Sequence, residues 1–159
     1  MSLFSNYPLI AAFASIIFAQ VVKVPLYFVT NRTWNVGLAF SSGSMPSSHS
    51  AAVASLSTAI GIVNGITSTS FAIAVVFSSI IMFDAAGVRR HAGNQAIVLN
   101  RLMKEFNEFV QEMRAKPKNS SQDKQREALK ELLGHRPIEV FVGAIVGICI
   151  SFVLYFVYF

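Results

Sequence analysis

Residues 137–159 read PIEVFVGAIVGICISFVLYFVYF and contain one charged side chain, Glu139, near the start of the run. A helix needs about 20 mostly apolar residues to cross a bilayer, so this run predicts a membrane span. The whole chain of 159 residues is 53% hydrophobic and 13% charged, whereas a soluble domain carries about 25% charged residues. We therefore expect an integral membrane protein. A soluble domain, a disordered chain and a disulfide scaffold are excluded, the last because Cys149 is the only cysteine.

Three further runs that are apolar and almost uncharged precede this one, at about 7–29, 46–64 and 69–88. Several serines lower the hydropathy of the second run, but its small residues suit a helix that packs closely against its neighbours. We therefore predict an all-α fold: a polytopic membrane helical bundle with about four transmembrane helices, forming a single domain over 1–159.

The segment 89–136 lies between the third and fourth predicted spans and carries 11 Lys and Arg against six acidic residues, which supplies the whole net charge of +5. Apolar residues recur at helical spacing over about 96–113, and a second short helix is expected at 123–133, so we predict an amphipathic cytoplasmic helical hairpin. Its charges either are simply solvated or hold the hairpin on the anionic inner leaflet.

In this topology all 13 Lys and Arg fall on one side of the membrane or at its edge. Cytoplasmic loops carry the excess of Lys and Arg, so we predict that this side is cytoplasmic. The small size of the chain suits a multi-pass protein of a bacterial plasma membrane. The basic segment would be cytoplasmic and both termini would lie outside.

Ionisable residues within or at the ends of membrane spans are costly, and they are therefore candidates for function. In the predicted topology they all gather at the cytoplasmic end of the bundle, whereas independent structural roles would scatter them over both ends. They are Lys23, His49, Asp84, Arg89, Arg90, His91, His135, Arg136 and Glu139.

Side chains of these kinds suit a phosphoryl group. Guanidinium and ammonium groups bind phosphate oxygens, and one histidine can attack phosphorus while another protonates the leaving oxygen. Glu139 lies one helical turn after His135 and could orient its ring. Ser47 and Ser48, at the start of a helix, offer hydroxyls and backbone N–H groups. Abundant cations disfavour a metal ion, so we expect no metal and no cofactor.

Two motifs, MPSSHS at 45–50 and GHRPIE at 134–139, resemble those of the type 2 phosphatidic acid phosphatase superfamily, which also contains bacterial acid phosphatases and vanadium haloperoxidases. The closer likeness is to its divergent, short membrane branch and runs over nearly the whole chain. The resemblance implies that His135 is a nucleophile forming a phosphohistidine, that Glu139 orients it and that His49 is the general acid. It also implies a phosphate-binding set, namely Lys23, Arg32, Ser47, Ser48, Arg89 and Arg90.

The chain departs from the general superfamily pattern at several of these positions. Ser48 stands in place of a glycine and Glu139 in place of an aspartate. Leu129 occupies the position of the arginine that precedes the nucleophile by six residues, so Arg89 or Arg90 would take that role if 91–133 is an insertion. Each residue also has a structural alternative, such as a helix cap for His49 or an ion pair with Arg136 for Glu139.

These observations predict a membrane-embedded phosphoric monoester hydrolase that acts on a lipid phosphate, similar to phosphatidylglycerophosphate or phosphatidate, at the cytoplasmic interface. One alternative is a catalytically inactive protein that binds or moves an anionic lipid, and another is a polyprenyl pyrophosphate phosphatase. The expected partners are the lipid phosphate and the anionic inner leaflet, with no nucleic acid. The sequence leaves the oligomeric state open.

Overall fold

The structure, a computed structural model, describes residues 6–32, 44–113 and 135–158. These ranges form five helices and contain no strand, which confirms the all-helical prediction. The helices are α1 (Tyr7–Asn31), α2 (Ser48–Asn64), α3 (Thr69–Ala86), α4 (Val88–Met113) and α5 (Pro137–Tyr158).

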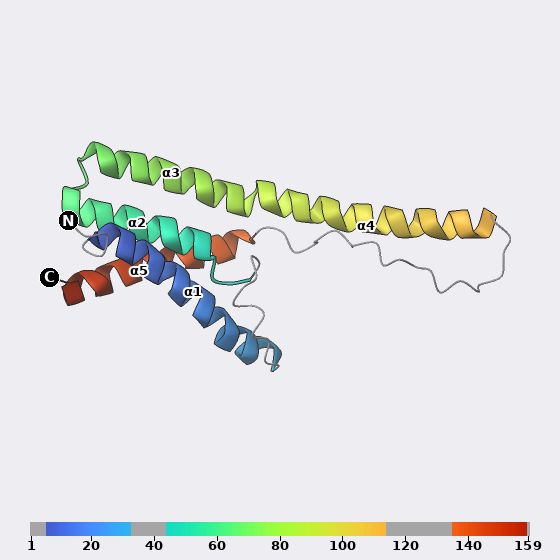
Figure 1. Ribbon diagram of the computed structural model, residues 1–159, viewed down its shortest axis with the longest axis horizontal. Coiled ribbons are helices and arrows are strands. Elements are labelled where there is room, and N and C mark those ends of the chain that lie inside the picture. The colour runs from blue at the N-terminus through green and yellow to red at the C-terminus, as the bar shows by residue number, and fades with distance from the viewer. Residues whose placement is uncertain (1–5, 33–43, 114–134, 159) are drawn as a thin grey trace.

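Helix α2 is the centre of the bundle and packs against α1, α3 and α5 (Figure 1). Small side chains let neighbouring backbones approach closely, and the buried residues of α2 are almost all serine and alanine: Ser48, Ser50, Ala51, Val53, Ala54, Ser55, Ser57 and Ala59. Helix α5 approaches α2 very closely, because Gly143 and Gly147 lie against the backbone of Ser47 and Ala51. The serine content that lowers the hydropathy of α2 therefore reflects its central position.

Two ends of the bundle can be distinguished (Figure 1). One end holds the start of α1, the end of α5 and the turn between α2 and α3, where Gly65 adopts a positive φ of 82°. The other end holds the start of α2, the start of α5 and the junction of α3 with α4. Helix α4 continues the direction of α3 and projects beyond the bundle, while the end of α1 diverges from the other helices.

Three segments within the described ranges are long and apolar enough to cross a membrane: Tyr7–Val29, Thr69–Val110 and Pro137–Val157. Helix α2, which corresponds to the second predicted span, has 17 residues and is not one of the three, so the expected count of about four spans stays a prediction. Helix α4 covers the stretch expected to form the first arm of the hairpin, although it begins at Val88 and not near residue 96. The hairpin itself stays a prediction. The second arm, 123–133, lies outside the described residues.

Helices α2 and α3 are joined by hydroxyl groups. The Oγ atoms of Ser57 and Ser78 lie 2.7 Å apart, and Ser78 Oγ also lies 3.0 Å from the carbonyl oxygen of Val53 across the interface. Both side chains are buried. In an apolar environment such contacts hold helices together without any hydrophobic driving force.

We expect Ser78→Ala to lower the free energy of unfolding by about 0.5–1.5 kcal/mol, because it removes hydrogen bonds between two helices. The matched control is Ser79→Ala: Ser79 is exposed and donates to Val75 O of its own helix at 2.9 Å. Unfolding measured in detergent should separate the two variants. Equal effects would mean that the Ser57–Ser78 contact does not stabilise the bundle.

Candidate functional site

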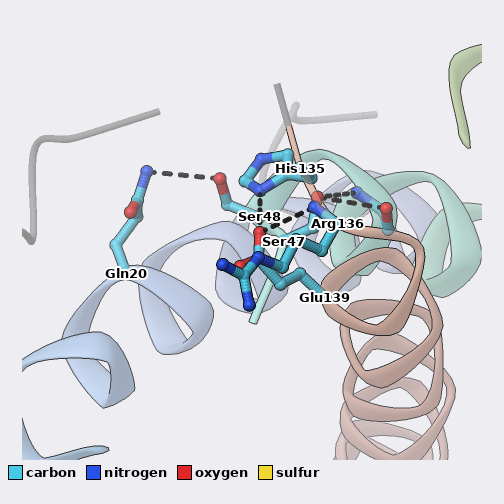
Figure 2. A network of polar contacts seen from close by, with 7 residues as sticks. Gln20, Ser47, Ser48, His135, Arg136 and Glu139 are labelled. Atoms are coloured by element: carbon cyan, nitrogen blue, oxygen red, sulfur yellow. Dashed lines mark hydrogen bonds and ion pairs between the residues drawn. The ribbon is translucent and has the colours of Figure 1, made fainter. Parts of the chain in front are cut away.

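His135 lies two residues before the start of α5 and makes several fixed contacts (Figure 2). Its Nδ1 lies 3.1 Å from Oε2 of Glu139, one helical turn further on, and the same Oε2 accepts the backbone N–H of Arg136 at 3.1 Å. The backbone N–H of His135 donates to Ala85 O at the end of α3, at 3.0 Å. The His135 residue is 2% exposed. The imidazole is therefore held in one position with Nδ1 directed at a carboxylate.

This pairing determines what the ring can do chemically. A neutral imidazole carries one proton, and a carboxylate next to Nδ1 favours the tautomer in which Nδ1 holds it. Nε2 then carries the lone pair that can attack an electrophile. The negative charge of Glu139 also stabilises the imidazolium that forms when Nε2 is alkylated, phosphorylated or protonated.

The start of α2 meets the start of α5 at this point. The backbone N–H of Ser47 donates to Glu139 O at 3.0 Å, and Ser47 Oγ caps α2 by accepting from the N–H of Ser50 at 3.4 Å. His49 follows in the first turn, and its ring centroid lies 6.2 Å from that of His135. Two histidines that are far apart in the sequence are thus neighbours in space, and His49 is the exposed one.

Helix α1 contributes a buried cation. Lys23 is 1% exposed, and the carboxylate of Glu139 attracts its ammonium group. A buried charge requires a nearby opposite charge, and Glu139 provides it for Lys23 as well as facing His135. One turn earlier on α1, the amide Nε2 of Gln20 donates to Ser48 Oγ at 3.2 Å (Figure 2).

The structure thus brings together His135, Glu139, His49, Ser47, Ser48 and Lys23 from the predicted set. It places Arg32 elsewhere: the residue is exposed, with a φ of 56°, and ends α1 where that helix diverges from the bundle (Figure 1). Arg90 is exposed in the first turn of α4. Arg89 belongs to the same turn, and its side chain lies outside the described part.

Sequence reasoning missed two kinds of residue at this site. Gln20 is uncharged and sits within an apolar run, so nothing in the pattern distinguishes it from a tolerated polar residue. Gly143 and Gly147 were also overlooked, although their G-x-x-x-G spacing in a membrane span is a recognisable signal of close helix packing.

The fold and the site define a helical membrane protein with a buried histidine, a half-buried glutamate that contacts it and a buried lysine at one end of its bundle. The chain belongs to the Divergent PAP2 family, whose family model matches residues 4–150, and the resemblance inferred from the two histidine motifs is confirmed. The chain is 52% identical over 154 residues to the uncharacterized membrane protein YuiD of Bacillus subtilis (strain 168), a similarity that covers 97% of each chain. No solved structure matches the chain.

Proposed function

We propose that this protein is an integral membrane lipid phosphatase that hydrolyses a phosphomonoester through a phosphohistidine, without a metal ion. The observation that carries the proposal is the His135–Glu139 contact of 3.1 Å with the ring of His49 6.2 Å away. One histidine is oriented by a carboxylate as a nucleophile, and a second, exposed histidine stands beside it as a proton donor. Membership of a family related to phosphatidic acid phosphatases supports this assignment.

The reaction would have two steps. His135 Nε2 attacks phosphorus, the ester P–O bond breaks, and protonated His49 gives its proton to the departing alkoxide. A water molecule then attacks the phosphorus of the phosphohistidine while neutral His49 accepts its proton, the P–N bond breaks, and inorganic phosphate leaves. The Lys23 ammonium and the hydroxyls of Ser47 and Ser48 would stabilise the phosphoryl oxygens.

The membrane context extends the proposal. The basic segment 89–136 would lie in the cytoplasm and be attracted to the anionic inner leaflet. The site would then act on lipid phosphates made on that leaflet, such as phosphatidylglycerophosphate or phosphatidate. Outward-facing polyprenyl pyrophosphates fit this orientation less well.

The burial of His135 favours a second candidate function. At 2% exposure, the atoms that cover the ring must move before a phosphate reaches Nε2. A protein that only binds or moves an anionic lipid needs no such access and would keep Lys23 and the serines as its binding groups.

Phosphate release separates the two functions. Purified protein in detergent with a chelator should release inorganic phosphate from lipid phosphates, and His49→Ala should reduce the rate by about 10²–10⁴-fold, because the leaving alkoxide loses its proton donor. If the wild type binds lipid phosphate but releases none from any lipid, the binding function is the correct one.

A further inference from the structure

The side-chain amide of Gln20 makes a hydrogen bond through its nitrogen but none through its oxygen. Its Nε2 donates to Ser48 Oγ at 3.2 Å, on the side of Ser48 away from the His135–Glu139 pair (Figure 2). Its Oε1 is buried and has no hydrogen-bond partner in the part of the chain that the structure describes. Buried carbonyl acceptors are normally paired, and leaving one unpaired is costly. The unsatisfied oxygen therefore points to a donor that a ligand would bring.

The nature of this atom restricts the ligand group. A carbonyl oxygen accepts hydrogen bonds and repels the oxygens of an ionised phosphate, so Gln20 Oε1 is suited to a hydroxyl and not to the phosphate itself. The bond to Ser48 fixes the amide in this orientation. Because Ser48 Oγ accepts from Gln20, its own hydrogen is available for donation to a phosphoryl oxygen.

The position of Gln20 along α1 locates that hydroxyl relative to the phosphate. Gln20 and Lys23 are three residues apart and so lie on one face of the helix. Since α1 runs toward the end of the bundle that holds the site, Gln20 lies one turn deeper than Lys23 (Figure 1). A lipid with its terminal phosphate at Lys23 and His135 would present to Gln20 the atoms on the membrane side of that phosphate.

We propose that Gln20 Oε1 accepts a hydrogen bond from a headgroup hydroxyl adjacent to the scissile phosphate, so that the site selects a glycerol phosphate headgroup. Phosphatidylglycerophosphate carries such a hydroxyl, whereas phosphatidate and polyprenyl phosphates carry none. This inference rests on the proposed phosphatase function and names its substrate class. Gln20 is thereby a specificity-determining residue.

The test compares kcat/KM for phosphatidylglycerophosphate and phosphatidate with identical acyl chains in mixed micelles. We expect the wild type to prefer the glycerol phosphate headgroup by about tenfold or more. Gln20→Met keeps the length of the side chain without either polar end, and it should reduce the ratio of the two kcat/KM values to about one. Ser47→Ala is the matched control: it removes a hydroxyl of the phosphate-binding set other than the one that orients Gln20, and it should lower both values while keeping the ratio.

Gln20→Glu provides a second variant that retains an acceptor. Its added negative charge should lower both kcat/KM values but preserve the preference. A thermal unfolding scan of each variant tests whether the helical bundle is intact. A wild type without preference, or a Gln20→Met variant that lowers both values equally, would overturn the assignment. Absence of phosphate release from either lipid by the wild type would instead overturn the phosphatase function, and the substrate assignment with it.

Discussion

Substitution of His135 by alanine is expected to eliminate covalent phosphate labelling and to reduce phosphate release by about 10⁴-fold or more, since the nucleophile is lost. Wild-type protein mixed with a lipid labelled on its terminal phosphate and quenched in alkali should carry the label on one histidine. Glu139→Gln leaves the nucleophile in place but removes the charge that stabilises its imidazolium. Labelling in that variant should therefore slow by about 10²–10⁴-fold without being abolished.

His91→Ala is the matched control for this experiment. His91 is exposed on α4 and is one of the ionisable residues predicted at the cytoplasmic end of the bundle. It has no role in the proposed reaction. Its labelling should equal that of the wild type. Label that persists in His135→Ala, or that disappears in His91→Ala, would refute His135 as the nucleophile.

The helical part of the fold was predictable because charge and hydropathy mark the ends of apolar helices. The expected runs at 7–29, 69–88 and 137–159 differ from the bounds of α1, α3 and α5 by two residues or fewer. The start of α4 was predicted too late, since apolar periodicity is weak just after Val88. No proline interrupts that stretch, so the helix begins directly after Gly87 despite its polar composition.

The His135–Glu139 contact was predictable for a different reason. Glu139 lies in the first turn of α5, and its carboxylate turns back to accept the backbone N–H of Arg136, the residue just before the helix. The short separation in sequence therefore brings that carboxylate to the ring of His135. Predicting that His49 lies near His135 required the membrane topology as well, because the topology places the starts of α2 and α5 at the same end of the bundle. The contact of Gln20 with Ser48 depends on how two helices are aligned along each other, which no local pattern specifies.

The alignment of a second pair of helices, α2 and α5, follows from small residues that repeat along both of them. Gly143 lies against Ser47 and Gly147 against Ala51, so an advance of four residues along one helix matches four along the other. The same relation continues at the far end, where Tyr155 packs on the cluster that contains Ala59. The two helices therefore run side by side in parallel, and the two glycines set their distance at the end where the site lies.

We expect Gly147→Ala to lower the free energy of unfolding by about 2–3 kcal/mol, even though alanine is the better helix former by about 1 kcal/mol. A Cβ atom at this position would overlap the backbone of Ala51, including its carbonyl oxygen, and a rigid backbone cannot move aside as a side chain can. Unfolding measured in detergent or in lipid bilayers would determine the change.

Gly61→Ala is the matched control, because a Cβ there would meet the ring of Phe71, whose nearest atom lies 2.9 Å away and can rotate. Its stability should change by less than about 1 kcal/mol. Gly143→Ala forms the third arm: its Cβ would overlap Ser47 O, and the backbone N–H of Ser47 holds Glu139 O at 3.0 Å. It should therefore reduce phosphate release as well as stability. Equal stability of Gly147→Ala and Gly61→Ala would show that α5 can shift away from α2. In that case a rigid contact between the two helices would not be what positions His135 and Glu139 beside His49.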